Sequence, residues 1–183
     1  MPDSTAAAPG DSTVPAGPPT PLEQVVVEVE RHVAAEGWDR PARLFALVPT
    51  ADLAAAEPGL ADALAGSGEL TPIEQEELPQ AEGLEALLAG IAWPEEVAGA
   101  ALVAERLMLP SAAEDEIPAD EQAGLAWVAA HPERQEVRLA VGVLRDGSRW
   151  SVVRLRTHDA DRDVLVGSDL VPGLADALAG TFL

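Results

Sequence analysis

The clearest structural signal in this sequence is the stretch EVRLAVGVLRDGSRWSVVRLR, residues 136–156. Two runs of alternating apolar and other residues flank Asp146-Gly147, and this pattern is typical of a β-hairpin. A two-residue loop at Asp146-Gly147 would place apolar residues and arginines together on each face. A three-residue loop, Arg145–Gly147, with Gly147 in the left-handed conformation, separates them. The sequence therefore favours the three-residue loop.

This loop sorts the hairpin side chains into two faces of different character. One face is apolar and carries Val137, Leu139, Val141, Val143, Val153 and Leu155. The other face carries Arg138, Ala140, Gly142, Trp150, Val152, Arg154 and Arg156. In this register Trp150 lies opposite Gly142, which leaves the indole room to lie flat. A slip of one residue would move every side chain to the opposite face, so the separation supports the register.

Helix-capping patterns, the spacing of apolar residues, and Gly or Pro residues that end helices and strands predict the other elements. Thr20-Pro21-Leu22-Glu23 has the capping-box pattern and begins a helix that ends before Gly37. Thr71-Pro72-Ile73-Glu74 repeats that pattern and indicates another helix start. Further helices are expected at residues 50–56, 60–64 and 84–91 and around Trp127, and residues 170–183 should form a helix or a pair of short turns. Strands are expected at residues 43–48 and 99–109. This order predicts an α+β fold with a mainly antiparallel sheet of about four strands and helices packed on it.

Composition limits the classes of partner. The chain has 183 residues, 48% of them hydrophobic, and 32 acidic residues against 11 basic ones give a formal net charge of −21. A polyanion is repelled by nucleic acid and by anionic lipid, so neither nucleic acid nor membrane is expected as a partner. The longest apolar run, residues 97–104, is too short to cross a bilayer.

The first twenty residues differ in composition from the rest. They are rich in Pro, Ala, Ser, Thr and Gly, and they lack the basic start and apolar block of a secretory signal. Such a segment cannot bury enough surface to fold. We expect a disordered Pro/Ala/Ser-rich tail over residues 1–20, a single α+β domain over residues 21–183, and a cytoplasmic location.

Few residues suggest catalysis. The chain contains no Cys and no Lys, which excludes thiol nucleophiles, disulfides, cysteine-ligated zinc and Schiff-base chemistry. Alternating acids in residues 157–163 (THDADRD) resemble the start of a calcium loop, but Val164 and Leu170 stand where Gly and Glu are needed. We therefore expect no metal, no cofactor and no catalytic residue. The alternative function is a metal-independent enzyme that uses His158 and nearby aspartates for acid–base chemistry.

Four stretches of the chain resemble a known family. They are LEQVVVEVERHVAAEGWDRPARLFALVPT (22–50), WPEEVAGAALVAERLMLP (93–110), HPERQEVRLAVGVLRDG (131–147) and DLVPGLADALAGTFL (169–183). They are similar to a family of uncharacterised acidic cytoplasmic proteins from actinobacteria, and the resemblance covers roughly residues 22–183. It implies one globular cytoplasmic domain. That family has no assigned function, so the resemblance implies no activity, cofactor or site residue.

Charge is divided unevenly along the chain. Residues 1–133 carry 25 acids and 4 arginines, whereas residues 134–183 carry 7 of each. Within the neutral part, arginines share one hairpin face with a tryptophan, and these residue types are enriched at interface hot spots. The candidate binding residues are Arg138, Trp150, Arg154 and Arg156. We expect a non-enzymatic protein-binding or adaptor module whose partner is an acidic peptide or a second copy of the chain.

An alternative role for the arginines follows from the excess of acid. Glu105 stands in the middle of an apolar strand, so it should either pair with an arginine or lie at the sheet edge. The hairpin arginines can then pair with the chain's own carboxylates, Glu105 included, beneath a covering helix.

Added salt should raise the melting temperature of the folded chain. The chain repels itself at a net charge of −21, and salt screens that repulsion over a Debye length of about 8–10 Å near physiological ionic strength. Thermal unfolding followed by circular dichroism from low to moderate NaCl measures the effect. A melting temperature that does not change with salt would contradict it.

Overall fold

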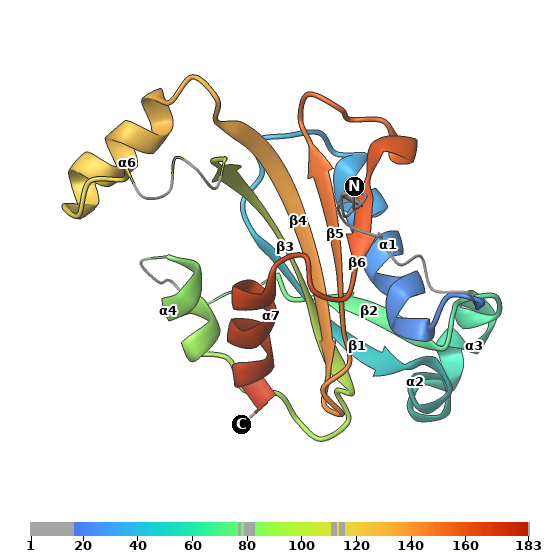
Figure 1. Ribbon diagram of the computed structural model, residues 1–183. Coiled ribbons are helices and arrows are strands. Elements are labelled where there is room, and N and C mark those ends of the chain that lie inside the picture. Colours follow the sequence, from blue (N-terminus) through green and yellow to red (C-terminus); the bar gives the residue numbers. More distant parts are fainter. Residues whose placement is uncertain (1–16, 77, 79–82, 111–112, 114–115, 183) are drawn as a thin grey trace, which may run out of the picture.

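The fold is built on one six-stranded antiparallel sheet with the strand order β2-β1-β3-β4-β5-β6 (Figure 1). The computed structural model describes residues 17–76, 78, 83–110, 113 and 116–182. The strands are β1 (Arg43–Pro49), β2 (Leu70–Glu74), β3 (Gly99–Met108), β4 (Gln135–Leu144), β5 (Arg149–Leu155) and β6 (Leu165–Gly167). The two longest strands, β3 and β4, pair over their whole length at the centre of the sheet. The predicted hairpin therefore contributes one of the two central strands.

Helix α1 (Pro21–Ala34) covers one face of the sheet. Its predicted cap is confirmed, because the Thr20 side-chain oxygen accepts a hydrogen bond from the Glu23 backbone N–H at 3.3 Å. The apolar stripe of α1 packs on side chains from β1 to β5. This core consists of Leu22, Val25, Val26, Val29, Val33, Phe45, Leu47, Leu70, Ala101, Val103, Ala140, Trp150 and Val152.

The opposite face is covered by α4 (Leu84–Ala89) and α7 (Pro172–Ala179), followed by a 3₁₀ turn at Gly180–Phe182. Its core consists of Leu44, Leu88, Ala100, Leu102, Val141, Val143, Ala175 and Leu178. Successive residues of a strand point to opposite faces, so β3 and β4 supply both cores in alternation. Sheet and helices thus form three layers.

Smaller helices lie in the connections. The segment between β1 and β2 contains α2 (Thr50–Ala56), a 3₁₀ turn at Pro58–Leu60, and α3 (Ala61–Leu64). Between β3 and β4 lies α6 (Glu121–Ala130), which stands apart from the three layers in Figure 1. Another 3₁₀ turn, Asp161–Asp163, precedes β6. No helix in the described part of the chain is long and apolar enough to cross a membrane.

The α+β class and the antiparallel sheet are as predicted, but the predicted number of about four strands is wrong. The segment from Thr71 to Glu74 belongs to strand β2 rather than to a helix start, and it pairs with β1. The Thr71 hydroxyl lies 2.8 Å from the hydroxyl of Thr50, the first residue of α2, instead of capping a helix of its own. Pro72 is tolerated because β2 is an edge strand. The other missed strand, β6, has only three residues and no periodic pattern to reveal it.

The predicted hairpin register is confirmed. Gly142 pairs with Trp150 and Arg138 pairs with Arg154. The Gly147 N–H donates to the Leu144 carbonyl at 3.0 Å, and Gly147 has a φ of 89°, as the three-residue loop requires. The expected reason for a glycine at 142 needs correction, because a helix residue fills the space above it. A Cβ built on Gly142 would lie 2.3 Å from Cγ2 of Val26.

The predicted division of the chain stays a prediction. Helix α1 begins at Pro21, next to the expected boundary between residues 20 and 21. Of the predicted tail, residues 1–16 lie outside the described residues.

Replacing Gly142 by alanine should destabilise the fold by about 1–3 kcal/mol, because the new methyl group forces α1 away from the sheet. The nearest obstacles are Val26 at 2.3 Å and Leu22 at 3.0 Å, both in α1. Gly173→Ala is the matched control, since a Cβ there meets nothing within 4 Å and the position is helical. That change should be neutral or slightly stabilising. Urea unfolding measures both, and equal effects of the two variants would contradict the packing.

Candidate binding site

The four candidate binding residues lie on the α1 face of β4 and β5 or at its end, but they do not form one open surface. Arg138 and Arg154 have side chains only 0% and 2% exposed, beneath α1. Arg156 is partly exposed at the end of β5. Trp150 is 9% exposed and lies nearer the N-terminal half of α1. Arg138 and Arg154 are therefore paired with the chain's own carboxylates beneath a helix, as the alternative role of the arginines expects. Binding of a partner by the four residues stays a prediction.

Glu30 of α1 is the centre of the buried charges. Its side chain is 1% exposed, and both carboxylate oxygens accept hydrogen bonds from Arg154, at 2.7 Å from Nε and 2.8 Å from Nη2. This bidentate geometry is the strong form of an arginine–carboxylate pair, and it raises the pKa of Arg154. Nη1 of Arg138 lies 3.9 Å from the same carboxylate. One helix carboxylate therefore lies between two strand arginines.

Arg138 is held mainly by the loop that follows α1. Its Nη2 donates to Glu105 Oε1 at 3.0 Å and to the carbonyl of Gly37, and its guanidinium lies 4.3 Å from the ring centroid of Trp38. The expectation that Glu105 pairs with an arginine is confirmed. Nε and Nη1 of Arg138 are buried without an acceptor among the described residues. Stacking of the guanidinium on the Trp38 indole partly offsets the free-energy cost of burying these unpaired donors.

Two further aspartates attach loops to this cluster. Arg154 donates from Nη2 to Asp161 at 2.8 Å, and these bonds lower the pKa of the Asp161 carboxyl. Arg156 donates to both oxygens of Asp39 at 2.9 Å and lowers the pKa of that carboxyl in the same way. Both carboxylates thus stay charged well into the acidic range, and they hold the loops before β1 and after β5 against the sheet.

A signal for Glu30 is present in the sequence and was missed. The apolar stripe of α1 runs through positions 22, 25, 26, 29 and 33, and position 30 belongs to the same face. A glutamate there has to be paired when the helix packs. The identity of its partners could not be predicted, because they come from strands more than one hundred residues away.

The residues suspected of acid–base or metal chemistry make other contacts in the structure. His158 is exposed, and its Nδ1 lies 3.0 Å from the hydroxyl of Thr157. Asp159 accepts a hydrogen bond from Trp38 Nε1 at 3.0 Å, and Asp161 pairs with Arg154. Within the described ranges, no group of three or more His, Asp or Glu side chains could hold a metal ion. These contacts assign the loop acids to structure, and the enzyme alternative stays an untested prediction.

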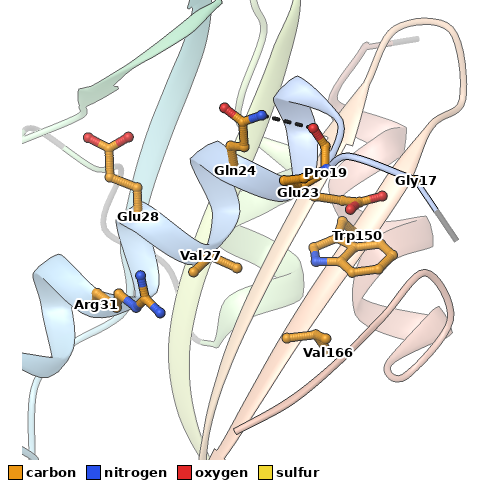
Figure 2. Close-up of a pocket in the computed structure, with 9 residues that line it drawn as sticks. All are labelled: Gly17, Pro19, Glu23, Gln24, Val27, Glu28, Arg31, Trp150 and Val166. Atoms are coloured by element: carbon orange, nitrogen blue, oxygen red, sulfur yellow. Dashed lines mark hydrogen bonds between the residues drawn. The ribbon is translucent and has the colours of Figure 1, made fainter. Parts of the chain in front are cut away.

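A groove of about 660 Å³ runs between α1 and the sheet edge at β6, with Trp150 between them (Figure 2). We call it the Trp150 groove, and it is lined by Gly17, Pro19, Glu23, Gln24, Val27, Glu28, Arg31, Trp150 and Val166. A second hollow of about 680 Å³ lies on the other side of the α1 N-terminus and shares Glu23 and Trp150 with the first. Trp150 therefore contributes to both depressions.

The indole N–H of Trp150 has no hydrogen-bond acceptor among the described residues, although it is buried. Figure 2 shows the indole nitrogen turned toward the space between Val27 and Val166. An unpaired buried donor costs about 1–3 kcal/mol, so such groups are rare in folded proteins. Trp93 shows the usual case, since its N–H donates to Thr181 at 2.8 Å. The indole nitrogen is closed to solvent, so an acceptor in the groove can reach it and remove this cost only when a neighbouring side chain moves aside.

Fold and groove together define an α+β protein with one six-stranded antiparallel sheet between helical layers and an apolar groove at one sheet edge. The chain belongs to the PPA1309-like protein family, whose model matches residues 22–183. The family is named after a protein of Propionibacterium acnes, an actinobacterium, which agrees with the actinobacterial resemblance. No curated protein and no solved structure matches the chain. The family description names no activity, so function has to be argued from geometry.

Glu30→Gln should lower the free energy of unfolding by about 3 kcal/mol or more, because it leaves two buried arginines without their shared carboxylate. Glu28→Gln is the matched control, an exposed position on the same helix. It should change stability by less than about 0.5 kcal/mol. Guanidinium chloride unfolding measures both, and a Glu30 variant as stable as the Glu28 variant would show that the charges are dispensable.

Proposed function

We propose that this chain is a non-enzymatic, cytoplasmic protein-binding module that holds its partner in the Trp150 groove. The observation that carries the proposal is the buried indole N–H of Trp150, which has no acceptor among the described residues and faces the groove. A main-chain carbonyl of a bound segment supplies the missing acceptor. Of the four candidate binding residues, Trp150 is the one that touches the partner.

The lining of the groove supports a protein partner. Trp150 and Val27 offer apolar surface, and charged residues stand only around them, at Glu23, Glu28 and Arg31. An apolar centre with a polar rim is the ordinary anatomy of a protein interface. Tryptophan is also among the residues that dominate binding energy when they lie in a desolvated pocket.

Arg138 and Arg154 support the groove from a distance. They hold the C-terminal half of α1 on the sheet through Glu30 and so fix the helix that forms one wall. Trp150 lies on β5, which pairs with the central strand β4 on one side and with the edge strand β6 on the other. A groove with both walls fixed before binding loses little conformational entropy when a partner enters.

Selection of a displayed library of random twelve-residue peptides on the full chain tests the proposed function. We expect enriched peptides whose affinity falls about fivefold or more in Trp150→Phe, which keeps an aromatic ring and removes the donor. Trp93→Phe is the matched control, because Trp93 packs in the core under α7. Isothermal titration measures the affinities.

Two results would refute the binding module. One is a selection that enriches no peptide above uncoated beads. The other is a set of peptides that bind the Trp150 and Trp93 variants equally well, since such peptides would use another surface.

A further inference from the structure

We propose that the bound segment is an extended, net-basic peptide that adds to the sheet as a strand along the open edge of β6 and places apolar side chains over Trp150. This inference rests on the proposed function of the Trp150 groove and names the chemistry and binding mode of its partner.

The outer edge of β6 presents main-chain groups that have no partner among the described residues. Hydrogen-bonded pairs alternate along an antiparallel ladder. The Leu144 N–H donates to Ser148, and the Arg156 N–H donates to Glu136, so even-numbered residues of β5 bond to β4. Odd-numbered residues of β5 therefore bond to β6, where Ser151 pairs with Gly167 and Val153 pairs with Leu165. Val166 lies between those partners, and its N–H and C=O point away from β5.

Within the described residues, strand β6 itself carries few of the features that keep sheet edges from pairing. Natural proteins protect an edge strand with charges, proline or a covering segment. Strand β6 contains Leu165, Val166 and Gly167 only, and the first two side chains are 56% and 48% exposed. Among the described elements, β6 packs extensively on β5 alone. Among the described residues, β6 is protected by its short length and by the acids that flank it, Asp163 and Asp169.

The edge and the groove are continuous. Val166 pairs with Val152, whose side chain belongs to the core under α1, so the Val166 side chain is on the same face. Val166 also lines the Trp150 groove. A strand paired with Val166 would direct every second side chain toward α1 and the indole. A single ligand can thus pair with the edge of β6 through its main chain and fill the groove with its side chains.

Charge favours a basic segment over an acidic one. Glu23 and Glu28 line the groove, and the one cation there, Arg31, lies 3.9 Å from Asp161. Acids also flank β6, at Asp163 and Asp169. With a formal net charge of −21, the whole chain attracts a cation-rich partner from a distance. The acidic peptide expected from the arginine face does not suit this groove.

A second copy of the chain suits the edge less well. Pairing of β6 with β6 would bring Asp163 and Asp169 of the two copies close together, and each copy carries a net charge of −21. Like charges placed opposite each other in a sheet are destabilising. The experiment below therefore includes a dimer of the chain as a contrary result.

The test uses two nine-residue probe peptides, one of alternating lysine and valine and one of alternating glutamate and valine. They are titrated into the full chain, Val166→Pro, Val166→Thr and Trp150→Phe. Proline removes the outward N–H of Val166, and an edge strand tolerates it because that N–H makes no ladder bond. Threonine keeps the N–H and the branched shape. Circular dichroism confirms that the variants are folded.

We expect the lysine peptide to bind the full chain, more weakly as salt is added, and the glutamate peptide not to bind. Affinity for the lysine peptide should fall about fivefold or more in Trp150→Phe, and it should be about fivefold or more weaker in Val166→Pro than in Val166→Thr, which keeps the N–H. Amide signals of Val166 should shift on titration in nuclear magnetic resonance spectra of the full chain.

Each contrary result has a defined meaning. If Val166→Pro binds as well as Val166→Thr while Trp150→Phe is weakened, strand addition is wrong and the groove function stands. If Trp150→Phe also binds normally, both proposals are wrong. Equal binding of the glutamate peptide overturns the basic partner. A dimer in analytical ultracentrifugation that Val166→Pro abolishes would make a second copy the occupant and overturn the peptide proposal.

Discussion

The packing of α1 on the sheet depends on one carboxylate, Glu30, placed between two buried arginines. Removing charges from water is costly, and attraction in the interior repays the cost only when the geometry is good. Here Arg154 binds Glu30 through two hydrogen bonds, while Arg138 lies beside it and also pairs with Glu105. An apolar stripe by itself would permit α1 to shift along the sheet by a turn. Only one position of the helix brings Glu30 to both arginines, so the charges select that position.

The position of α1 determines the rest of this face. One and two turns before Glu30, Val26 and Leu22 pack on the bare backbone of Gly142, where no larger residue fits. The N-terminal half of the helix then runs beside Trp150 and forms a wall of the groove. The same cluster also fixes the loops that flank it, through Trp38 over Arg138 and Asp161 on Arg154. Packing at one end of α1 thereby shapes the groove at the other.

Local patterns made much of this fold predictable. The hairpin register follows from period-two alternation and one glycine turn, and the start of α1 follows from its capping box. Strand β2 was missed because the pattern at Thr71 also suits a helix, and only its pairing with β1 decides between the two. Strand β6 is too short to carry a pattern. The sequence names Trp150 as a candidate binding residue, and that stays a prediction; the groove beside it depends on α1 and β6, which come near each other only in the folded chain.

A double-mutant cycle between Glu30 and Arg154 tests most directly whether the buried charges position α1. The cycle compares Glu30→Leu, Arg154→Met and the double variant by urea unfolding. Each single change removes the bidentate partner of a buried charge, whereas the double change leaves two apolar residues of similar size. We predict a coupling free energy of at least about 2 kcal/mol, so that the double variant is no less stable than either single one. Effects that add to within about 0.5 kcal/mol would contradict the central role of this pair.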